Sequence, residues 1–245
     1  MPGELSSVLS GPAIDPNFPI ELLESDDLLA IVSQVSLAEF GQSALDDRVN
    51  DPAWVETKIR AHDKIIKNAR SLGSIIPCRF CTILRSRQDV EDLLRHHRRR
   101  IAAKLAALDG KSEWGVKLWL AAPSNASQPQ EISGKAYLQH KRNARDHRRQ
   151  LQRPAEDRAE QFHKDLAATA AEAALLPIRD RAGEDSAEIA LNGAYLVADQ
   201  QRTHFEDEIA DWSNRHAAEG WRVEITGPWP PYNFAQLDLS MEAAA

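Results

Sequence analysis

The stretch Gly110-Lys-Ser-Glu-Trp-Gly-Val-Lys-Leu-Trp-Leu-Ala121 decides how the second half of this chain folds. Its apolar side chains alternate, with Trp114, Val116, Leu118 and Leu120 on one face and Lys117 on the other. This period of two predicts a strand with one buried face. Because Asp109-Gly110 ends the preceding helical pattern, we expect the chain to restart here and a second domain to begin at residue 111.

Downstream, the pattern alternates between strands and helices. We expect a loop over 122–134, helices over 135–152 and 155–175 separated at Pro154, strands near 177–181 and over 187–198, a helix marked by Phe205, Ile209 and Trp212, and a last strand over 221–225. Gly220 ends the last helix. The order βαββαβ predicts a ferredoxin-like domain over 111–227, with its first crossover enlarged to two helices.

Upstream, the same signals predict a smaller set of elements. We expect strands over 18–24 and 28–36, a helix that begins at Asp51-Pro52, a strand over 74–84 and a helix over 87–108. The order ββαβα indicates a modified ferredoxin-like α+β domain over 1–110 that lacks its usual first strand. The fold prediction is therefore α+β with two domains, followed by an extended tail over 228–245.

Composition narrows the function classes. Of 245 residues, 42% are apolar and 27% charged, and the net charge of −7 argues against a general nucleic-acid binder. No apolar run approaches the ~20 residues of a membrane span, and Met1–Gly11 lacks the pattern of a secretory signal. We therefore expect a cytoplasmic protein. The basic clusters at 95–100 and 140–153 are interpreted as solvated helix faces. For 140–153, docking of an acidic partner is the weaker alternative, and RNA binding is weaker still because no aromatic residues are interleaved after Tyr137.

The reactive residues do not form a catalytic pattern. Cys78 and Cys81 fall within the expected strand, where residues three apart point to opposite faces, so buried free thiols are favoured over a redox or metal pair. His62 lies on an apolar helical stripe and reads as a core histidine. The chain has no P-loop, GxGxxG or GxSxG motif. We predict no enzyme activity, no metal and no cofactor.

Two groups of residues are candidates for partner binding or for an internal latch. Arg79 and Phe80 could hold a partner, although contacts that lock the two domains are favoured for Arg79. In the tail, prolines fix an extended backbone, and its rings either latch onto the protein's own core or face a partner. The latch is favoured, so we expect Trp229, Tyr232 and Phe234 to be mostly buried. The candidates are Arg79, Phe80, Trp229, Pro230, Pro231, Tyr232 and Phe234.

Three stretches together resemble the gas vesicle proteins GvpF/GvpL. They are Ala61-His-Asp-Lys-Ile-Ile66 with Ile75-Ile-Pro-Cys-Arg-Phe80, then Gly110–Trp119, and finally Thr226-Gly-Pro-Trp-Pro-Pro-Tyr-Asn-Phe234. The chain departs from the family pattern at Cys81, where the family has glycine. It also lacks the family's aromatic first strand within Met1–Gly11.

The resemblance implies a non-enzymatic accessory protein for gas vesicle assembly. Such proteins are two-domain α+β factors that bind the very apolar shell protein during nucleation or growth of the vesicle. The implied partners are the shell protein and other gas vesicle accessory proteins, with no nucleic acid and no membrane. The implied location is the cytoplasm and the gas vesicle. The alternative is a minor structural component built into the vesicle wall.

Overall fold

A computed structural model describes residues 13–121, 153–178 and 187–237. The chain forms two compact units. One contains the residues up to Lys111 together with those from Trp229 onward, and the other contains Ser112–Pro228. Each unit is described by itself below.

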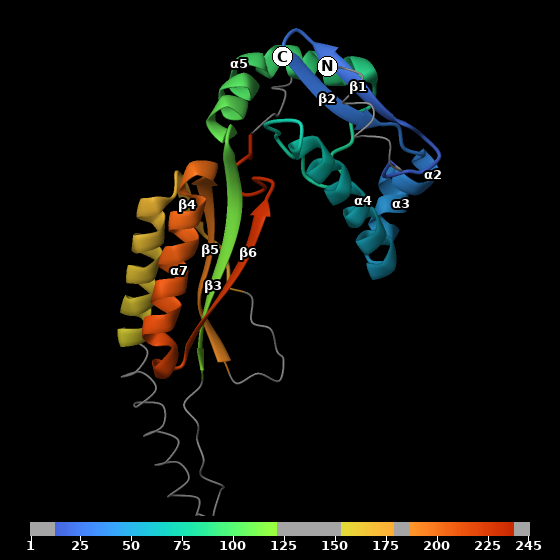
Figure 1. Cartoon of the computed structure of the whole chain (residues 1–245). Helices are drawn as coiled ribbons and strands as arrows, with labels where there is room; N and C mark the ends of the chain where they lie inside the picture. The colour runs from blue at the N-terminus through green and yellow to red at the C-terminus, as the bar shows by residue number, and fades with distance from the viewer. Residues whose placement is uncertain (1–12, 122–152, 179–186, 238–245) are drawn as a thin grey trace, which may run out of the picture. The chain divides into compact units, whose positions relative to one another are not determined.

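The first unit combines a β-hairpin with helices. Strands β1 (Ile20–Ser25) and β2 (Leu28–Ser33) pair antiparallel. Helices α2 (Leu37–Phe40), α3 (Gln42–Arg48), α4 (Pro52–Arg70) and α5 (Arg87–Leu108) follow (Figure 1). Leu28 from the hairpin packs with Leu94 and Ile101 from α5, so the buried face of α5 covers the hairpin. The predicted hairpin and both long helices are confirmed.

Side-chain caps fix where the two long helices begin. The Asp51 carboxylate accepts hydrogen bonds from the amides of Ala53 and Trp54, and Pro52 occupies the first turn of α4. Ser86 accepts from the amide of Asp89 and starts α5 in the same way. Each cap satisfies donors that the helix itself leaves free.

In its described part, the second unit is a four-stranded sheet with two helices, and these lie on one face of the sheet (Figure 1). In chain order it contains β3 (Lys111–Ala121), a helix over 153–169, β4 (Glu172–Leu175), β5 (Ala187–Ala198), α7 (Arg202–His216) and β6 (Trp221–Trp229). The strand order in the sheet is β4-β5-β3-β6. Gly220, with a left-handed backbone, ends the helical segment before β6.

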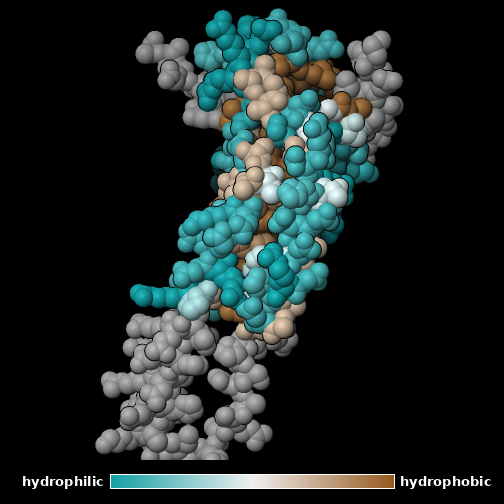
Figure 2. Space-filling model, turned by 60° about the vertical axis from the view of Figure 1, so that its left-hand side comes forward, coloured by the Kyte–Doolittle hydropathy of each residue, from teal (hydrophilic) through white to brown (hydrophobic). Residues whose placement is uncertain are grey.

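The core of this unit lies between the sheet and its helices. Trp114, Val116 and Leu118 of β3 face Phe162 and Leu166 of one helix and Phe205, Ile209 and Trp212 of α7. The alternation predicted for β3 is thus confirmed, with Val116 and Leu118 fully buried. The outer surface of the helices is mainly hydrophilic (Figure 2), as expected for a two-layer unit.

Two predicted elements are wrong. Residues 74–84 form no strand, because a turn closes at 79–82, where Thr82 N donates to Arg79 O, and Cys81 within it adopts a left-handed φ of 63°. A left-handed residue breaks the pleat of a strand. Among the described residues of the first unit, the sheet therefore has only β1 and β2.

The second correction concerns residues 170–181. We expected helix to 175, but the helix ends at 169 and β4 covers Glu172–Leu175. Of the strand expected near 177–181, residues 179–181 lie outside the described residues. Ala171 N donates to Leu196 O and Leu176 N to Asn192 O, so pairing with β5 overrides the helical preference of the alanines. The helix expected over 135–152 lies outside the described residues.

Replacement of Leu118 by alanine tests this core. Leu118 is fully buried, so Leu118→Ala should reduce the free energy of unfolding of the second unit by ~2–5 kcal/mol. The control is Leu175→Ala in β4, where the side chain is 61% exposed and the change should stay within ~0.5 kcal/mol. Urea unfolding followed by circular dichroism measures both, and equal losses would contradict the assignment of the core.

Candidate functional site: the C-terminal segment on helix α4

The segment from Trp229 to Leu237 belongs to the first unit and is anchored by small and aromatic side chains. Pro231 is fully buried, and Phe234 and Ala235 are 7% and 1% exposed. Leu237 packs against the cluster of Leu28, Leu94 and Ile101. The segment thus completes a core whose other residues lie far earlier in the chain.

The backbone of this segment turns where we expected an extended ribbon. Tyr232 N donates to Pro230 O and Ala235 N donates to Pro231 O, both at 2.8 Å. The prolines supply carbonyl acceptors to the turn while lacking donors of their own. The expected extended backbone is therefore limited to the prolines themselves, and residues 232–234 form a turn.

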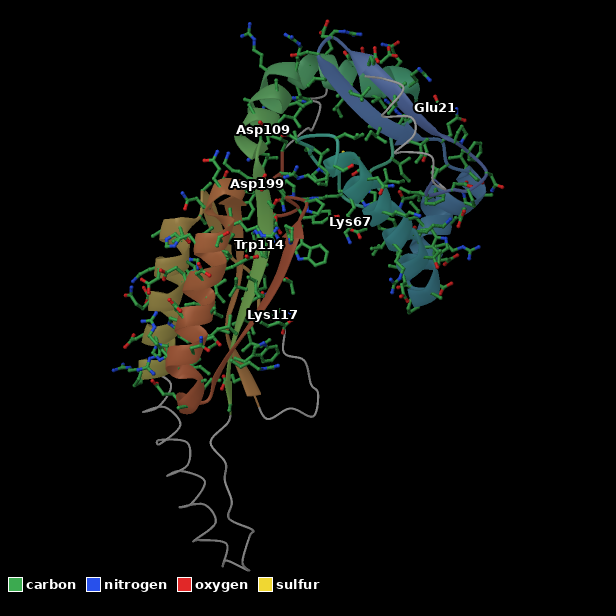
Figure 3. All side chains as sticks on the ribbon, viewed as in Figure 1. Glu21, Lys67, Asp109, Trp114, Lys117 and Asp199 are labelled. Carbon is green, nitrogen blue, oxygen red and sulfur yellow. The ribbon has the colours of Figure 1, made fainter. Side chains whose placement is uncertain are left out.

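Helix α4 receives the segment through one carboxylate. The Tyr232 hydroxyl donates to Asp63 Oδ1 at 2.6 Å, and Asp63 Oδ2 pairs with Lys67 at 2.7 Å, one helical turn away. Lys67 lies on α4 (Figure 3), and its Nζ is 4.8 Å from the ring centroid of Trp229. This cation–π contact and the hydrogen bond hold both ends of the Trp229–Tyr232 stretch to the same helix.

The charge state of Asp63 follows from these contacts. Burial alone raises the pKa of the Asp63 carboxyl, but hydrogen bonds from Lys67 and Tyr232 outweigh burial and lower the pKa below 3.8. Burial also lowers the pKa of the neighbouring His62, although the charge of Asp63 opposes that effect. At neutral pH the pair is therefore a carboxylate beside an uncharged imidazole.

Trp229 is the exception among the tail aromatics. We expected it to be mostly buried, yet 38% of its surface is exposed. The reason is its position: Trp229 ends β6 and is the first residue of the segment, before the buried prolines. The segment thus carries one half-exposed indole ahead of an anchored stretch.

Phe80 and Arg79 lie beside this segment in the same unit. Phe80 is half-buried in a row of rings, with centroids 6.3 Å from Trp54 and 5.9 Å from His62. His62 is thus half-buried against Phe80 rather than deep in the core. Arg79 is exposed and donates to the side chain of Gln236 at 3.4 Å. This hydrogen bond connects Arg79 with the C-terminal segment inside the first unit.

A set of buried polar residues at the other end of α4 was missed by the sequence analysis. Lys58 Nζ is 3.0 Å from the carbonyl oxygen of Ile14 and 2.9 Å from Glu39 Oε1, which also accepts from Trp54 Nε1 at 2.6 Å. Asp15, which is fully buried, accepts from the amides of Asn17 and Ser36. These partners are up to 44 residues apart, so no local pattern marks them.

The cysteines are free but not buried. Cys78 is exposed and Cys81 half-buried, because the strand expected to bury them is replaced by the turn at 79–82. Cys81 holds a left-handed backbone position, a conformation that favours glycine. Within the described ranges, no three His, Cys, Asp or Glu side chains gather as a metal site requires.

The basic cluster at 95–100 lies on helix α5. On α5, Arg95 pairs with Asp92 and Arg98 with Asp27, and both arginines are exposed. The segment 140–152 lies outside the described residues.

None of the helices within 13–121, 153–178 and 187–237 is both long and apolar enough to span a membrane.

Steric constraints explain why glycine occupies position 227 in Thr226-Gly-Pro-Trp229. Gly227 has a φ of 136°, and a Cβ there would lie 3.0 Å from Glu113 O and from the Trp114 ring. Any other residue would clash with β3 at the point where the chain leaves the second unit. This position is therefore restricted to glycine by packing and backbone conformation together.

Comparisons with known proteins agree with this architecture. A family model described as gas vesicle synthesis protein GvpL/GvpF matches residues 5–236. Gas vesicle protein L of Streptomyces sp. is 33% identical over 229 residues, which cover 89% of this chain and 84% of that protein. The crystal structure of GvpF from Anabaena sp. superposes with a TM-score of 0.62 and 16% identity, covering 92% and 89% of the two chains. GvpF from Microcystis aeruginosa gives 0.59 and 17%, covering 90% of each.

These matches define a gas vesicle protein of mixed α+β fold. The chain belongs to the GvpL/GvpF family of gas vesicle synthesis proteins. The resemblance of its three motifs to this family is confirmed, and family membership gives the protein a role in gas vesicle formation. Members of the family are not known as enzymes.

Truncation of Phe234 tests the anchoring of the segment. Phe234→Ala should lower the free energy of unfolding of the first unit by ~3–5 kcal/mol, because a buried ring is lost. Trp229→Ala should cost clearly less, because the indole is partly exposed. Urea unfolding with hydrogen exchange on the α4 amides reports on this unit, and equal losses from both variants would disprove the assignment.

The Asp63 contact should appear in the pH dependence of stability. The folded pKa of Asp63 is lowered, so its stabilisation is present above about pH 4 and is lost as the pH falls through the folded pKa. Asp63→Asn should therefore be less stable than wild type at pH 7 and lose less stability on acidification. Tyr232→Phe, which removes one donor, should be intermediate. The measurement is the urea midpoint at neutral and acid pH, and identical acid sensitivity in wild type and Asp63→Asn would refute the account.

Proposed function

We propose that this protein is an accessory factor for gas vesicle assembly that binds the apolar shell protein during nucleation or growth of the vesicle. The observation that carries the proposal is the half-exposed Trp229 at the head of an anchored segment. An indole on a backbone that is already fixed offers a large apolar contact area at a small entropic cost.

The physical need for such a factor follows from the shell protein's chemistry. A subunit with a water-repelling face aggregates unless a partner covers that face before incorporation. We place this protein in the cytoplasm and at the gas vesicle, with the shell protein and other gas vesicle accessory proteins as partners. The proposed role requires neither catalysis nor a cofactor.

We assign separate tasks to the residues of the site. Trp229, together with Lys67 above its ring, contacts the shell protein. The remaining latch residues keep the indole in place, and Arg79 and Phe80 hold the neighbouring turn. The latch residues are Pro230, Pro231, Tyr232 and Phe234.

We also propose that the second unit is a ferredoxin-like domain with an enlarged helical crossover. Its support is the strand order β4-β5-β3-β6, in which the first and third strands of the unit lie in the centre. Two helices on one face of the sheet also support this topology (Figure 1).

Co-expression with the shell protein and tag pull-down tests the assembly role. Wild type should recover shell protein at low salt without detergent. Trp229→Ala should weaken binding by about tenfold or more, because a central aromatic of an interface typically contributes over 1 kcal/mol. The matched control is Leu37→Ala, which removes another apolar side chain of the same unit that is 81% exposed. It should bind as wild type does.

Three results would overturn parts of this proposal. Failure of wild type to recover shell protein would refute direct binding. Retention of the protein on purified vesicles after a urea wash would identify it as a structural component of the wall rather than a transient factor. Equal binding by wild type and Trp229→Ala would reject the assigned surface.

A further inference from the structure

Strand β6 forms one edge of the four-stranded sheet, next to β3. Three contacts fix how the two strands pair: Ala121 N donates to Gly220 O, Lys117 pairs with Glu224, and the Thr226 hydroxyl lies 3.5 Å from Gly115 O. In these three contacts the residue number on β3 decreases as the residue number on β6 increases, so the two strands are antiparallel. Arg222 then lies opposite Trp119.

This register determines which backbone groups of β6 point outward. Gly220 bonds with β3, and bonding residues alternate along an antiparallel strand, so Arg222 and Glu224 also direct their amides and carbonyls toward β3. Trp221, Val223 and Ile225 direct theirs away from the sheet. The outer edge of β6 therefore offers hydrogen-bonding groups at every second residue.

The side chains along this edge alternate between two kinds. On the face away from the helices, Arg222 stacks over Trp119 with 5.2 Å to the ring centroid, and Glu224 is within 3.8 Å of Lys117. On the helix face, Trp221 and Val223 pack into the core, while Ile225 is 38% exposed. Arg222 and Ile225 are exposed side chains on this strand.

We infer that β6 pairs antiparallel with β6 of a second copy of this chain, about a two-fold axis at Val223. In this register Arg222 lies opposite the partner's Glu224, and Glu224 lies opposite the partner's Arg222. Trp221 lies opposite the partner's Ile225, whose exposed surface it covers. The outward groups of Val223 then bond with the partner's Val223, as the alternation along β6 requires.

Charge selects this register over its neighbours. An axis at Glu224 or at Arg222 would place like charges directly opposite each other, which is unfavourable. An axis at Ile225 would pair Glu224 with the partner's Thr226 and lose both ion pairs. Only the axis at Val223 gives two Arg–Glu pairs, and these extend the existing row of Lys117 and Glu224 into the second copy.

The strand's own protective features do not block this pairing. Proline and short length commonly protect an exposed edge. Pro228 lies beyond the paired residues, which run from Gly220 to Thr226. The opposite edge, β4, has only four residues, whereas β6 has nine. The two copies would form one continuous sheet of eight strands.

Light scattering after size-exclusion chromatography tests the inference on the full-length protein without any shell protein. The mass of wild type should rise toward that of a dimer as concentration increases. Arg222→Glu and Glu224→Arg should each weaken the dimer about tenfold or more, because each places like charges opposite each other. An equimolar mixture of the two variants should restore dimers, since every cross-strand pair is again of opposite sign.

The mixture distinguishes a loss of strand pairing from a loss of folding. A misfolded variant would not form dimers when the variant of opposite charge is added. Circular dichroism confirms that each variant retains its secondary structure. A wild type that stays monomeric at all concentrations, or a dimer unaffected by both charge reversals, would overturn the inference. The shell-protein pull-down is independent of this readout, so failure of one does not imply failure of the other.

Discussion

The first unit is closed by residues that lie far along the chain from the rest of it. The Tyr232–Asp63 hydrogen bond joins positions 169 residues apart, and Leu237 packs with Leu28, Leu94 and Ile101. The described part of this unit has a sheet of only two strands, which is marginal by itself. Burial of Pro231, Phe234 and Ala235 supplies apolar contact that the hairpin and helices lack. The position of Trp229, and so the candidate site, depends on that closure.

Much of the architecture could be predicted because it depends on local patterns. The alternation in β3, the Asp51 cap of α4 and the buried stripe of α5 are each visible within a few residues, and each is confirmed. One error arose where non-local contacts decide the outcome, and another where a local turn interrupts an apolar run. The alanines of 170–175 pair with β5 rather than extend the helix, and the turn at Cys81 prevents the strand expected over 74–84.

The site was predictable as a set of residues but not as a geometry. Family motifs pointed to Phe80 and to the aromatics after Pro228, yet no spacing reveals that Asp63 accepts from Tyr232. The exposure of Trp229 depends on where β6 ends, which the sequence pattern placed four residues too early. Lys58 lay outside the apolar stripe that drew attention to α4, although it is buried between Ile14, Glu39 and Phe40. Such residues become visible only when distant segments are brought together.

The discontinuous first unit has a consequence for the order of events during synthesis. The ribosome delivers residues 13–111 first, but their compact unit also needs Trp229–Leu237, which come after the whole of Ser112–Pro228. The second unit is continuous in sequence, so it can complete its core while the first still waits for its final segment. During that interval the aromatic row around Phe80 and the apolar face of α5 lack their C-terminal cover. Residues 13–111 are therefore made before Ser112–Pro228 but complete their packing only after it, once Trp229–Leu237 has been made.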